Sequence, residues 1–448
     1  MSSLPATAPV PTSTSFHLIN ARVPVDLAPA LADFAESDGL ASCEITVEDG
    51  RLTYVGAALQ RPKAEGLERL DMRHGIVLPR FVDIHTHLDK GHISGRAPNP
   101  DGTSLGARNA VIADREANWT AQDVATRMNF SLRCAFAHGT GAVRTHIDSL
   151  GKQAAISWPV FNEARSAWTG RVALQGVALF PGEMAADDEA QFKSLVEIVA
   201  RYDGLLGGNT YFSTGPDERL QRALDRMFAA AKAYGLNLDF HVDESDSLDA
   251  LSLEEIAKTA LRTRFKGQIT VGHCCSLALV ADADRRRIID RVGEAGIAVV
   301  SLPMCNMYLQ DRHAGRTPRW RGVTPLLELD QTGVTALVAS DNTRDPFYAY
   351  GDLDMIEVFR EATRILHLDH SARRWTRLFG ATAADIMGLP DHGRMRIGGP
   401  ADLVLLGART LSELVSRPQS DRVVLVSGAP VSAVLPDYRE LDNLFAPG

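Results

Sequence analysis

The chain of 448 residues has a formal net charge of −9, with 45% hydrophobic and 23% charged residues, as is ordinary for a globular protein with a large core. Its acidic balance argues against nucleic acid or an anionic membrane as partner, because both select basic patches. No apolar run is long enough to span a bilayer, and the N-terminus lacks the pattern of a secretory signal. The cysteines are odd in number and irregularly spaced, which predicts reduced thiols in a cytoplasmic protein. They are Cys43, Cys134, Cys274, Cys275 and Cys305.

Both ends of the chain are predicted to be rich in short β-strands. After a disordered lead-in at residues 1–15, apolar runs alternate with turn residues such as Asp49-Gly50 and Gly428. The predicted strands cover residues 16–23, 43–47, 52–56, 402–406 and 422–426. We expect residues 16–76 and 393–448 to form one small β-sandwich domain together.

The middle of the chain alternates short apolar strands with amphipathic segments such as 220–234 and 253–265. This alternation predicts an α/β fold with a parallel sheet covered by helices. The strands are expected at 75–87, 141–148, 171–180, 204–209, 236–243, 268–273, 297–302 and 334–341. Eight such units predict a closed (β/α)8 TIM barrel over residues 77–392. An open doubly wound sheet is the alternative, but no G-x-G-x-x-G follows the first strand.

Polar side chains that could bind a metal ion or transfer a proton follow several of the predicted strands. Active sites of parallel barrels lie at the carboxyl ends of the strands, so these side chains are expected to meet. His85 and His87 end the first strand two residues apart, and side chains at that spacing point the same way. The other candidates are His146 and Asp148, His241 and Glu244, His273, and Asp341 with Asn342.

The candidate ligands favour one divalent metal ion, Zn²⁺ or Fe²⁺. The ligand set is His85, His87, His241 and Asp341. Such an ion lowers the pKa of a bound water toward neutrality. Glu244, just beyond a strand end, suits the transfer of the water proton to a leaving group, and its alternative reading is a solvated carboxylate in an acidic loop. His273 would polarise the attacking water, and Asp341 would orient it.

Two further pairs stay open. His146 and Asp148 either support the metal ligands from the second strand or form a buried hydrogen-bonded pair without chemistry. Cys274 and Cys275 either bind metal or are small buried residues at a strand end, and no second cysteine pair supports the metal reading.

These motifs resemble the amidohydrolase superfamily, and most closely its cytosine deaminase branch, over nearly the whole chain. The matching segments are FVDIHTHLDK, GAVRTHIDS, LQGVALFPGE, LDFHVDES, VGHCCSL, MCNMYLQDR, RGVTPLLELDQTGV and ASDNTRDPFYAYG. The resemblance implies a single metal on the four ligands, with Glu244 as proton shuttle and His273 and Asp341 as assistants. Members with two metals usually bridge them through a carboxylated lysine on strand four. No lysine ends strands three or four, and Lys90 is not in the bridging position.

The resemblance also suggests substrate-binding positions at Phe180, Gly182, Asn342 and Phe347. Cytosine deaminases have a glutamine where this chain has Gly182, so we expect a changed ring or an enlarged pocket. The segment 99–119 is expected to cover the pocket.

The predicted function is a metal-dependent aminohydrolase that replaces an amino or imino group of a small nitrogen heterocycle by oxygen and releases ammonia. The alternative is hydrolysis of another C–N bond, in an alkylamino-triazine or a cyclic amide, on the same scaffold. Loss of enzymatic function is disfavoured because every ligand is present. Relatives are often homo-oligomers, so a homo-oligomer is possible here.

Overall fold

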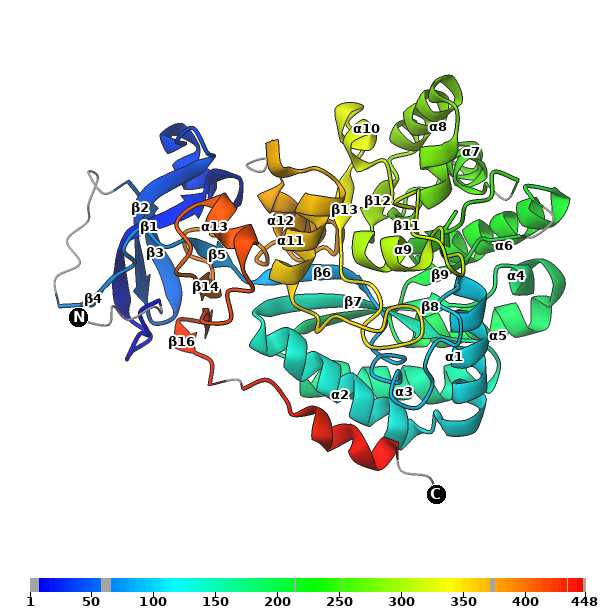
Figure 1. Cartoon of the computed structure of the whole chain (residues 1–448), viewed down its shortest axis with the longest axis horizontal. Coiled ribbons are helices and arrows are strands. Elements are labelled where there is room, and N and C mark those ends of the chain that lie inside the picture. The colour runs from blue at the N-terminus through cyan, green and yellow to red at the C-terminus, as the bar shows by residue number, and fades with distance from the viewer. Residues whose placement is uncertain are drawn as a thin grey trace.

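The computed structural model describes residues 8–57, 66–212, 215–249, 251–370, 375–432 and 434–445. Two β-layers lie at one end of the molecule, and a larger α/β region with parallel strands lies beside them (Figure 1). The parallel strands and the helices between them confirm the predicted α/β class. In the described ranges, no helix is long and apolar enough to cross a membrane.

The first β-layer comes from the N-terminal part of the chain. Its strand order is β3-β2-β1-β4. The bounds are β1 Phe16–Pro24, β2 Leu40–Glu48, β3 Arg51–Gly56 and β4 Glu68–Asp71. The predicted turn at Asp49-Gly50 connects β2 to β3, and both residues have positive φ, 48° and 75°, which glycine adopts readily.

Residues 8–15 lie against this layer instead of forming a disordered lead-in. Ala8 is buried, and Thr12 donates hydrogen bonds from its amide and its hydroxyl to the carboxylate of Glu68. Residues 1–7, the rest of the expected lead-in, lie outside the described residues.

The second β-layer joins both ends of the chain. Its strand order is β16-β15-β14-β5. The bounds are β5 Val77–Pro79, β14 Leu403–Leu405, β15 Val423–Val426 and β16 Ala429–Pro430. One hydrophobic cluster contains Phe16 and Ile45 of the first layer together with Leu403 and Leu425 of the second. Burial of these side chains between the layers ties the C-terminal strands to the N-terminal ones.

The parallel strands of the larger region follow each other in chain order, in the sheets β6-β7-β8 and β9-β10-β11-β12-β13. Their bounds are β6 Phe81–Thr86, β7 Thr140–Asp148, β8 Ala173–Leu179, β9 Leu206–Asn209, β10 Leu238–Val242, β11 Ile269–His273, β12 Ala298–Ser301 and β13 Ala336–Val338. Isolated parallel bridges join Val177 to Leu205 and Pro181 to Asn209, between β8 and β9. Another joins Thr86 to Asp341, between β6 and the segment after β13. Each strand lies within or next to the range predicted for it.

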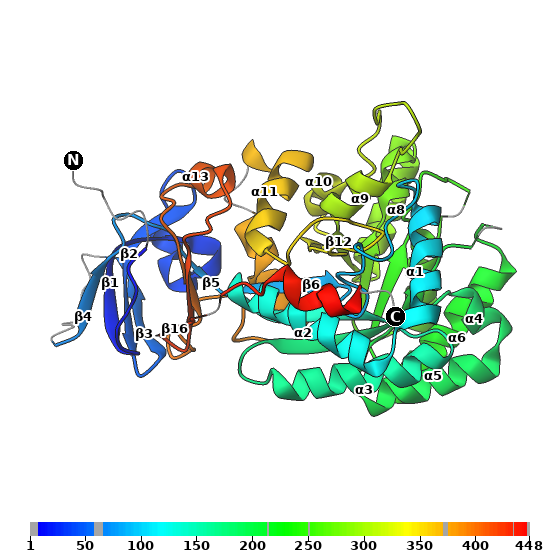
Figure 2. The same cartoon turned by 60° about the horizontal axis from the view of Figure 1, so that its bottom comes forward.

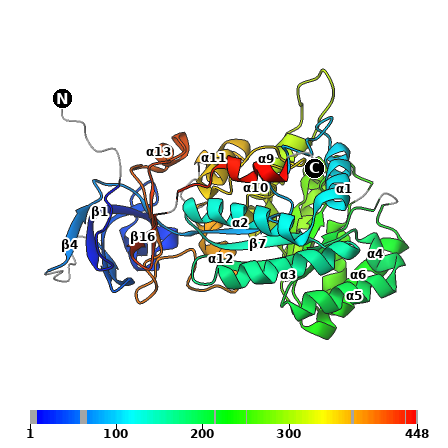
Figure 3. The ribbon, with the colours of Figure 1, turned by 90° about the horizontal axis from the view of Figure 1, so that it is seen from below.

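Helices alternate with these strands and cover them (Figures 1 and 2). They are α1 Ser104–Asn118, α2 Ala121–Ala137, α3 Lys152–Ala167, α4 Glu183–Asp187, α5 Glu189–Arg201, α6 Glu218–Tyr234, α7 Leu253–Thr263, α8 Asp282–Glu294, α9 Pro303–Leu309, α10 Leu326–Gln331, α11 Met355–Ile365, α12 Ala381–Ile386 and α13 Leu411–Ser416. The C-terminal segment Tyr438–Leu444 leaves the β-layers and lies along α2 (Figures 2 and 3). The C-terminal segment therefore contacts the parallel region, whereas the strands before it belong to the second β-layer.

Candidate active site

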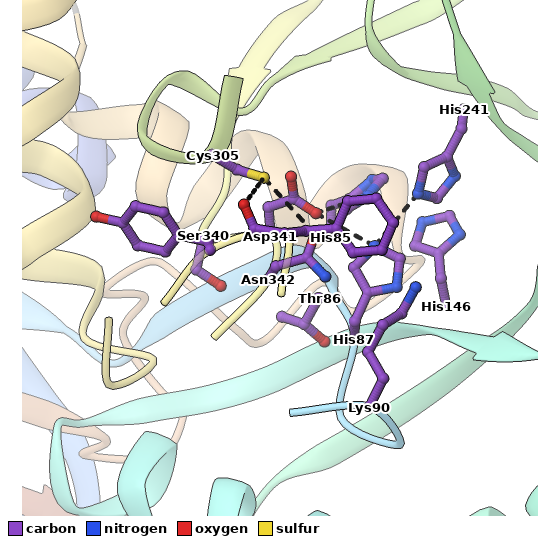
Figure 4. A network of polar contacts seen from close by, with 12 residues as sticks. His85, Thr86, His87, Lys90, His146, His241, Cys305, Ser340, Asp341 and Asn342 are labelled. Carbon is purple, nitrogen blue, oxygen red and sulfur yellow. Dashed lines mark hydrogen bonds and ion pairs between the residues drawn. The ribbon is translucent and has the colours of Figure 1, made fainter. Parts of the chain in front are cut away.

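Three predicted histidine ligands meet at the carboxyl ends of β6 and β10 (Figure 4). His85, His87 and His241 each offer a ring nitrogen, and these nitrogens lie within 4.8 Å of one another. Asp341 Oδ1 lies 3.2 Å from His87 Nε2 and 3.6 Å from His85 Nε2. The four predicted ligands are thus brought together, although the sequence separates them by up to 256 residues (341 minus 85).

The chemistry of these donors fits a metal ion. Neither carboxylate oxygen of Asp341 and neither ring nitrogen of His85 has a hydrogen-bond partner among the described residues, although both side chains are fully buried. Burial lowers the pKa of His85, His87 and His241 well below the usual range, which keeps the imidazoles in the neutral form that binds metal. Unpartnered buried polar atoms are costly, and a cation at this point would satisfy them together.

Backbone interactions fix the position of Asp341. Its amide donates to the carbonyl of His85 at 2.9 Å. One residue earlier, the amide of Ser340 donates to Asp83 Oδ1 at 3.2 Å, which links β6 to the end of β13. Asp341 has φ of 69° and His273 has φ of 73°, a left-handed conformation that is unusual for these residue types. Strain of this kind at strand ends is typical of functional sites.

Glu244 and His273 lie together, joined by Asn306 of α9. Asn306 Nδ2 lies 3.2 Å from Glu244 Oε1 and 2.9 Å from His273 Nδ1. Burial, and then the nearby charge of Asp341, raises the pKa of Glu244 to about 8. Burial lowers the pKa of His273 to about 3, so its ring is neutral. Glu244, the predicted proton-transfer residue, therefore lies beside the cluster of predicted ligands and is not a solvated carboxylate of an acidic loop.

His146 and Asp148 do not pair with each other, which rules out the buried-pair alternative. The His146 ring lies 4.0 Å from that of His85 between centroids, and its Nε2 lies 3.8 Å from Asp239 Oδ1. Neither of its nitrogens has a hydrogen-bond partner among the described residues. Asp148 instead lies 3.5 Å from Lys90 Nζ and 3.2 Å from Arg115 Nη1. His146 thus borders the ligand cluster, and Asp148 holds two cations at its edge.

Lys90 and Phe347 flank the cluster on one side. Lys90 Nζ lies 5.2 Å from the centre of the Phe347 ring, within cation–π range. Within the predicted covering segment 99–119, Asn99 donates to the carbonyl of Pro346 at 3.0 Å. This segment therefore contacts the loop that carries Phe347, as expected of a cover over the strand ends.

The other three predicted substrate-binding positions, Phe180, Gly182 and Asn342, have packing or hydrogen-bond contacts of their own. Phe180 is buried in the main core, with the centre of its ring 6.0 Å from that of Phe192 on α5. Asn342 donates to Asp345 at 2.6 Å. A Cβ at Gly182 would lie 2.6 Å from the carbonyl oxygen of Asn209, so glycine is required there for close packing. This packing accounts for the glycine at position 182, and the expected changed ring or enlarged pocket stays a prediction.

Sequence reasoning missed three residues at the site. Asn306 connects Glu244 to His273, Lys90 reaches the cluster from the end of the His-x-His motif, and Cys305 lies close to both carboxylates. One ligand atom each of Glu244, Cys305 and Asp341 lies within 4.8 Å of the others. Burial, then the charges of Asp341 and Glu244, raises the pKa of the Cys305 thiol well above its usual range. The position of Met304-Cys305-Asn306 directly after a predicted strand was the available signal.

Comparisons with known proteins identify a matching family, a related protein and similar solved structures. A model described as the amidohydrolase family matches residues 120–432. A pterin deaminase of Rhizobium rhizogenes (strain K84) is 54% identical over 436 residues, which cover 97% of this chain and 98% of the relative. The solved 5-methylcytosine deaminase of Klebsiella pneumoniae has a TM-score of 0.77 at 22% identity, with 94% of this chain and 98% of that chain covered. N-isopropylammelide isopropylaminohydrolase from Burkholderia multivorans has a TM-score of 0.72 at 25% identity, with the same coverage of both chains. This chain belongs to the amidohydrolase family, as the resemblance of its strand-end motifs indicated.

Proposed function

We propose that this protein is a metal-dependent pterin deaminase. It would hydrolyse the exocyclic C–N bond of a 2-amino-4-oxopteridine, so that water supplies the oxygen of the new carbonyl and ammonia leaves. The observation that carries the proposal is the 54% identity with a pterin deaminase along 97% of this chain. A two-ring pterin replaces the cytosine-like ring expected from sequence, and release of ammonia from a heterocycle is retained.

The scaffold we propose for this chemistry is a closed (β/α)8 barrel within residues 77–392, with a β-sandwich formed by residues 16–76 and 393–448. Two segments depart from these bounds, because β5 Val77–Pro79 pairs with the second β-layer and Tyr438–Leu444 lies along α2. The isolated bridges between β8 and β9, and between β6 and the segment after β13, support closure of the barrel. The hydrophobic cluster shared by both ends of the chain supports the sandwich. A closed barrel would bring every strand end to one active-site face.

The metal ion would be held by His85, His87, His241 and Asp341. When bound, a single Zn²⁺ or Fe²⁺ lowers the pKa of water so that hydroxide is available near pH 7. His146 lies against His85 and would hold that ligand in place through ring packing at 4.0 Å. The rest of the chemistry belongs to side chains of the protein.

Glu244 would move the proton. Its carboxylate can accept a proton from water and deliver it to the pteridine ring nitrogen and then to the departing amine. A pKa raised to about 8 suits both the uptake and the release of a proton near neutral pH. The nearby Asn306 amide, 3.2 Å from Glu244 Oε1, would hold the carboxylate in one orientation.

His273 would act as a hydrogen-bond donor. A carboxylate accepts hydrogen bonds, so the Asn306 group that faces Glu244 is its NH₂. The same NH₂ faces His273 Nδ1, which must then accept, and the ring proton of the neutral imidazole is on Nε2. Nε2 has no partner among the described residues, so its N–H is available to the attacking water or the developing oxyanion.

Lys90 and Phe347 are the side chains we propose to contact the pterin ring, since both border the cluster and Gly182 cannot carry a side chain. An ammonium group donates to carbonyl oxygens, and the 4-oxo group of a pterin is such an acceptor. Phe347 would pack against the flat ring. Replacing Lys90 by Met is therefore expected to raise KM for pterin more than it lowers kcat.

The test is release of ammonia from pterin and from cytosine, and of isopropylamine from N-isopropylammelide, by the purified protein, with metal per chain measured in parallel. We expect the highest kcat/KM for pterin and about one catalytic ion per chain. Higher kcat/KM for cytosine would contradict the pterin assignment. Release of isopropylamine would favour the second candidate, an alkylamino-triazine hydrolase, which the 25% identity with N-isopropylammelide isopropylaminohydrolase supports.

A further inference from the structure

A second group of metal-binding atoms lies beside the ligand cluster. Glu244, Cys305 and Asp341 each offer one ligand atom, all within 4.8 Å of one another. We propose that these three residues form a second, inhibitory site for a thiophilic divalent ion such as Zn²⁺. The inhibitory consequence rests on the proposed role of Glu244, whereas the binding itself does not.

Asp341 is shared with the proposed first metal site, whereas Glu244 and Cys305 belong to the second group alone. Asp341 is 1% exposed, and neither of its oxygens has a hydrogen-bond partner in the described part of the chain. Its Oδ1 faces His85 and His87, and a carboxylate can bridge two ions through its two oxygens. The Glu244 side chain is 18% exposed, so the group can be reached from solvent.

The sulfur atom determines which ion binds. Cys305 Sγ lies 3.7 Å from Asn342 Oδ1 and 3.8 Å from the carbonyl oxygen of Phe347, and it also interacts with the Asp341 side chain. Thiolate ligands favour Zn²⁺ and disfavour Mg²⁺ or Ca²⁺. Among the described residues, the other buried thiols, Cys43, Cys134, Cys274 and Cys275, belong to no such group.

Binding would release protons to solvent in exchange for the metal ion. The Cys305 thiol loses its proton as the sulfur–metal bond forms, and Glu244 gives up the proton that its raised pKa lets it keep near pH 7. Glu244 is then a metal ligand and can no longer accept a proton from water. Excess Zn²⁺ is therefore expected to inhibit the enzyme by blocking proton transfer while the first ion stays in place.

The experiment adds Co²⁺ to the full-length protein that already holds about one Zn²⁺ per chain. A thiolate-to-cobalt charge-transfer band in the near ultraviolet is specific for the second site, since the first site contains only nitrogen and oxygen ligands. We expect the band and a second ion per chain in the natural protein. Cys305→Ser should lose both and keep the first ion. The concentration of Zn²⁺ that halves ammonia release should rise at least about tenfold in this variant.

Cys134→Ser is the matched control, because Cys134 is a buried thiol outside the group, and it should retain the band. The proposal is overturned if the natural protein stays at one ion and shows no band in excess Co²⁺, a result that needs no variant to fold. A band that persists in Cys305→Ser also overturns it. Because absorbance and stoichiometry do not depend on turnover, failure of the pterin assignment would leave this result readable.

Discussion

Two clusters of buried charged and polar side chains lie within the same region of parallel strands and helices, and they differ in how their atoms are paired. At the strand ends, buried atoms of His85, His146 and Asp341 have no hydrogen-bond partner among the described residues. Behind them, Arg96 and Arg127 bind Asp123 at 2.6 Å each. Arg96 also forms a two-point pair with Asp114 at 2.8 and 3.0 Å.

The hydrogen-bond pairing of buried polar atoms distinguishes a cluster that can bind a ligand from a cluster that stabilises the fold. A fully paired buried network orders the loops and helices around it and leaves no site for a ligand. A cluster with unpaired donors and acceptors stores an unfavourable desolvation energy that a bound ion or substrate can relieve. Burial of charge alone would have ranked the two clusters as equal candidates for the active site.

The largest expected effect comes from the unpaired cluster. Glu244→Gln keeps the size of the side chain but removes its ability to carry a proton. We expect kcat for ammonia release to fall by roughly 10²- to 10⁴-fold, while the metal content stays unchanged. Steady-state kinetics with pterin and metal analysis of the same sample measure both quantities.

A matched control for that variant is Glu255→Gln, a glutamate on the outer face of α7 that pairs with Lys258. Its kcat should equal that of the natural protein. If Glu244→Gln retains most of its turnover, proton transfer belongs to another group and the proposed role of Glu244 is wrong.

A substitution in the paired cluster should lower the free energy of unfolding and leave the activity of the folded protein unchanged. Asp123→Asn leaves two buried guanidinium groups, Arg96 and Arg127, without their shared carboxylate. Removing one partner of a buried ion pair typically costs about 3–5 kcal/mol. Urea unfolding should show this loss in the free energy of unfolding, with kcat of the folded fraction little changed. A large fall in kcat without loss of stability would mean that the two clusters are not separate in function.

Removal of the metal tests the unpaired cluster by stability. An ion that binds only the folded state at a free concentration 100 times its Kd adds about 2.7 kcal/mol to the free energy of unfolding. A chelator should therefore lower Tm, and added Zn²⁺ should restore it. His85→Ala should start at the lower Tm and respond to neither. Equal Tm values with and without chelator would show that the cluster does not bind a metal ion strongly.

The sequence predicted which residues meet at the strand ends but could not show which polar side chains are hydrogen-bonded to one another. Strand periodicity and the His-x-His spacing were enough to predict that His85, His87, His241 and Asp341 meet, because parallel strands end on one side of a sheet. The sequence could not reveal that Asn306 joins Glu244 to His273, since that contact depends on the direction of α9 after β12.

The substrate-binding predictions remain predictions, and the contacts of these residues depend on packing that the sequence does not show. The orientation of Phe180 toward α5 and the crowding at Gly182 are set by packing between neighbouring elements, which one sequence does not encode in a local pattern. Residues that a family resemblance aligns with a pocket can therefore serve packing in a given member.

Acid pH provides a smaller test of the paired cluster. Burial acts to raise the pKa of Asp123, but hydrogen bonds and charges of Arg96 and Arg127 outweigh it and hold this pKa below its ordinary value. The stabilisation is complete above the pKa of the unfolded chain, about 3.9, and is lost as pH falls through the folded pKa. The difference in unfolding free energy between the natural protein and Asp123→Asn should therefore shrink below about pH 4. A constant difference would mean that Asp123 stabilises by packing and not by charge.

The smallest effect is expected for an exposed ion pair at the C-terminal segment. Arg133 of α2 and Glu440 lie 2.5 Å apart, but their side chains are 37% and 44% exposed. Solvent screens such pairs, and holding two long side chains costs conformational entropy, so surface pairs contribute little. Glu440→Gln should leave Tm within experimental error of the natural protein at moderate salt. A loss as large as that of Asp123→Asn would show that pairing, and not burial, governs the charged contacts of this fold.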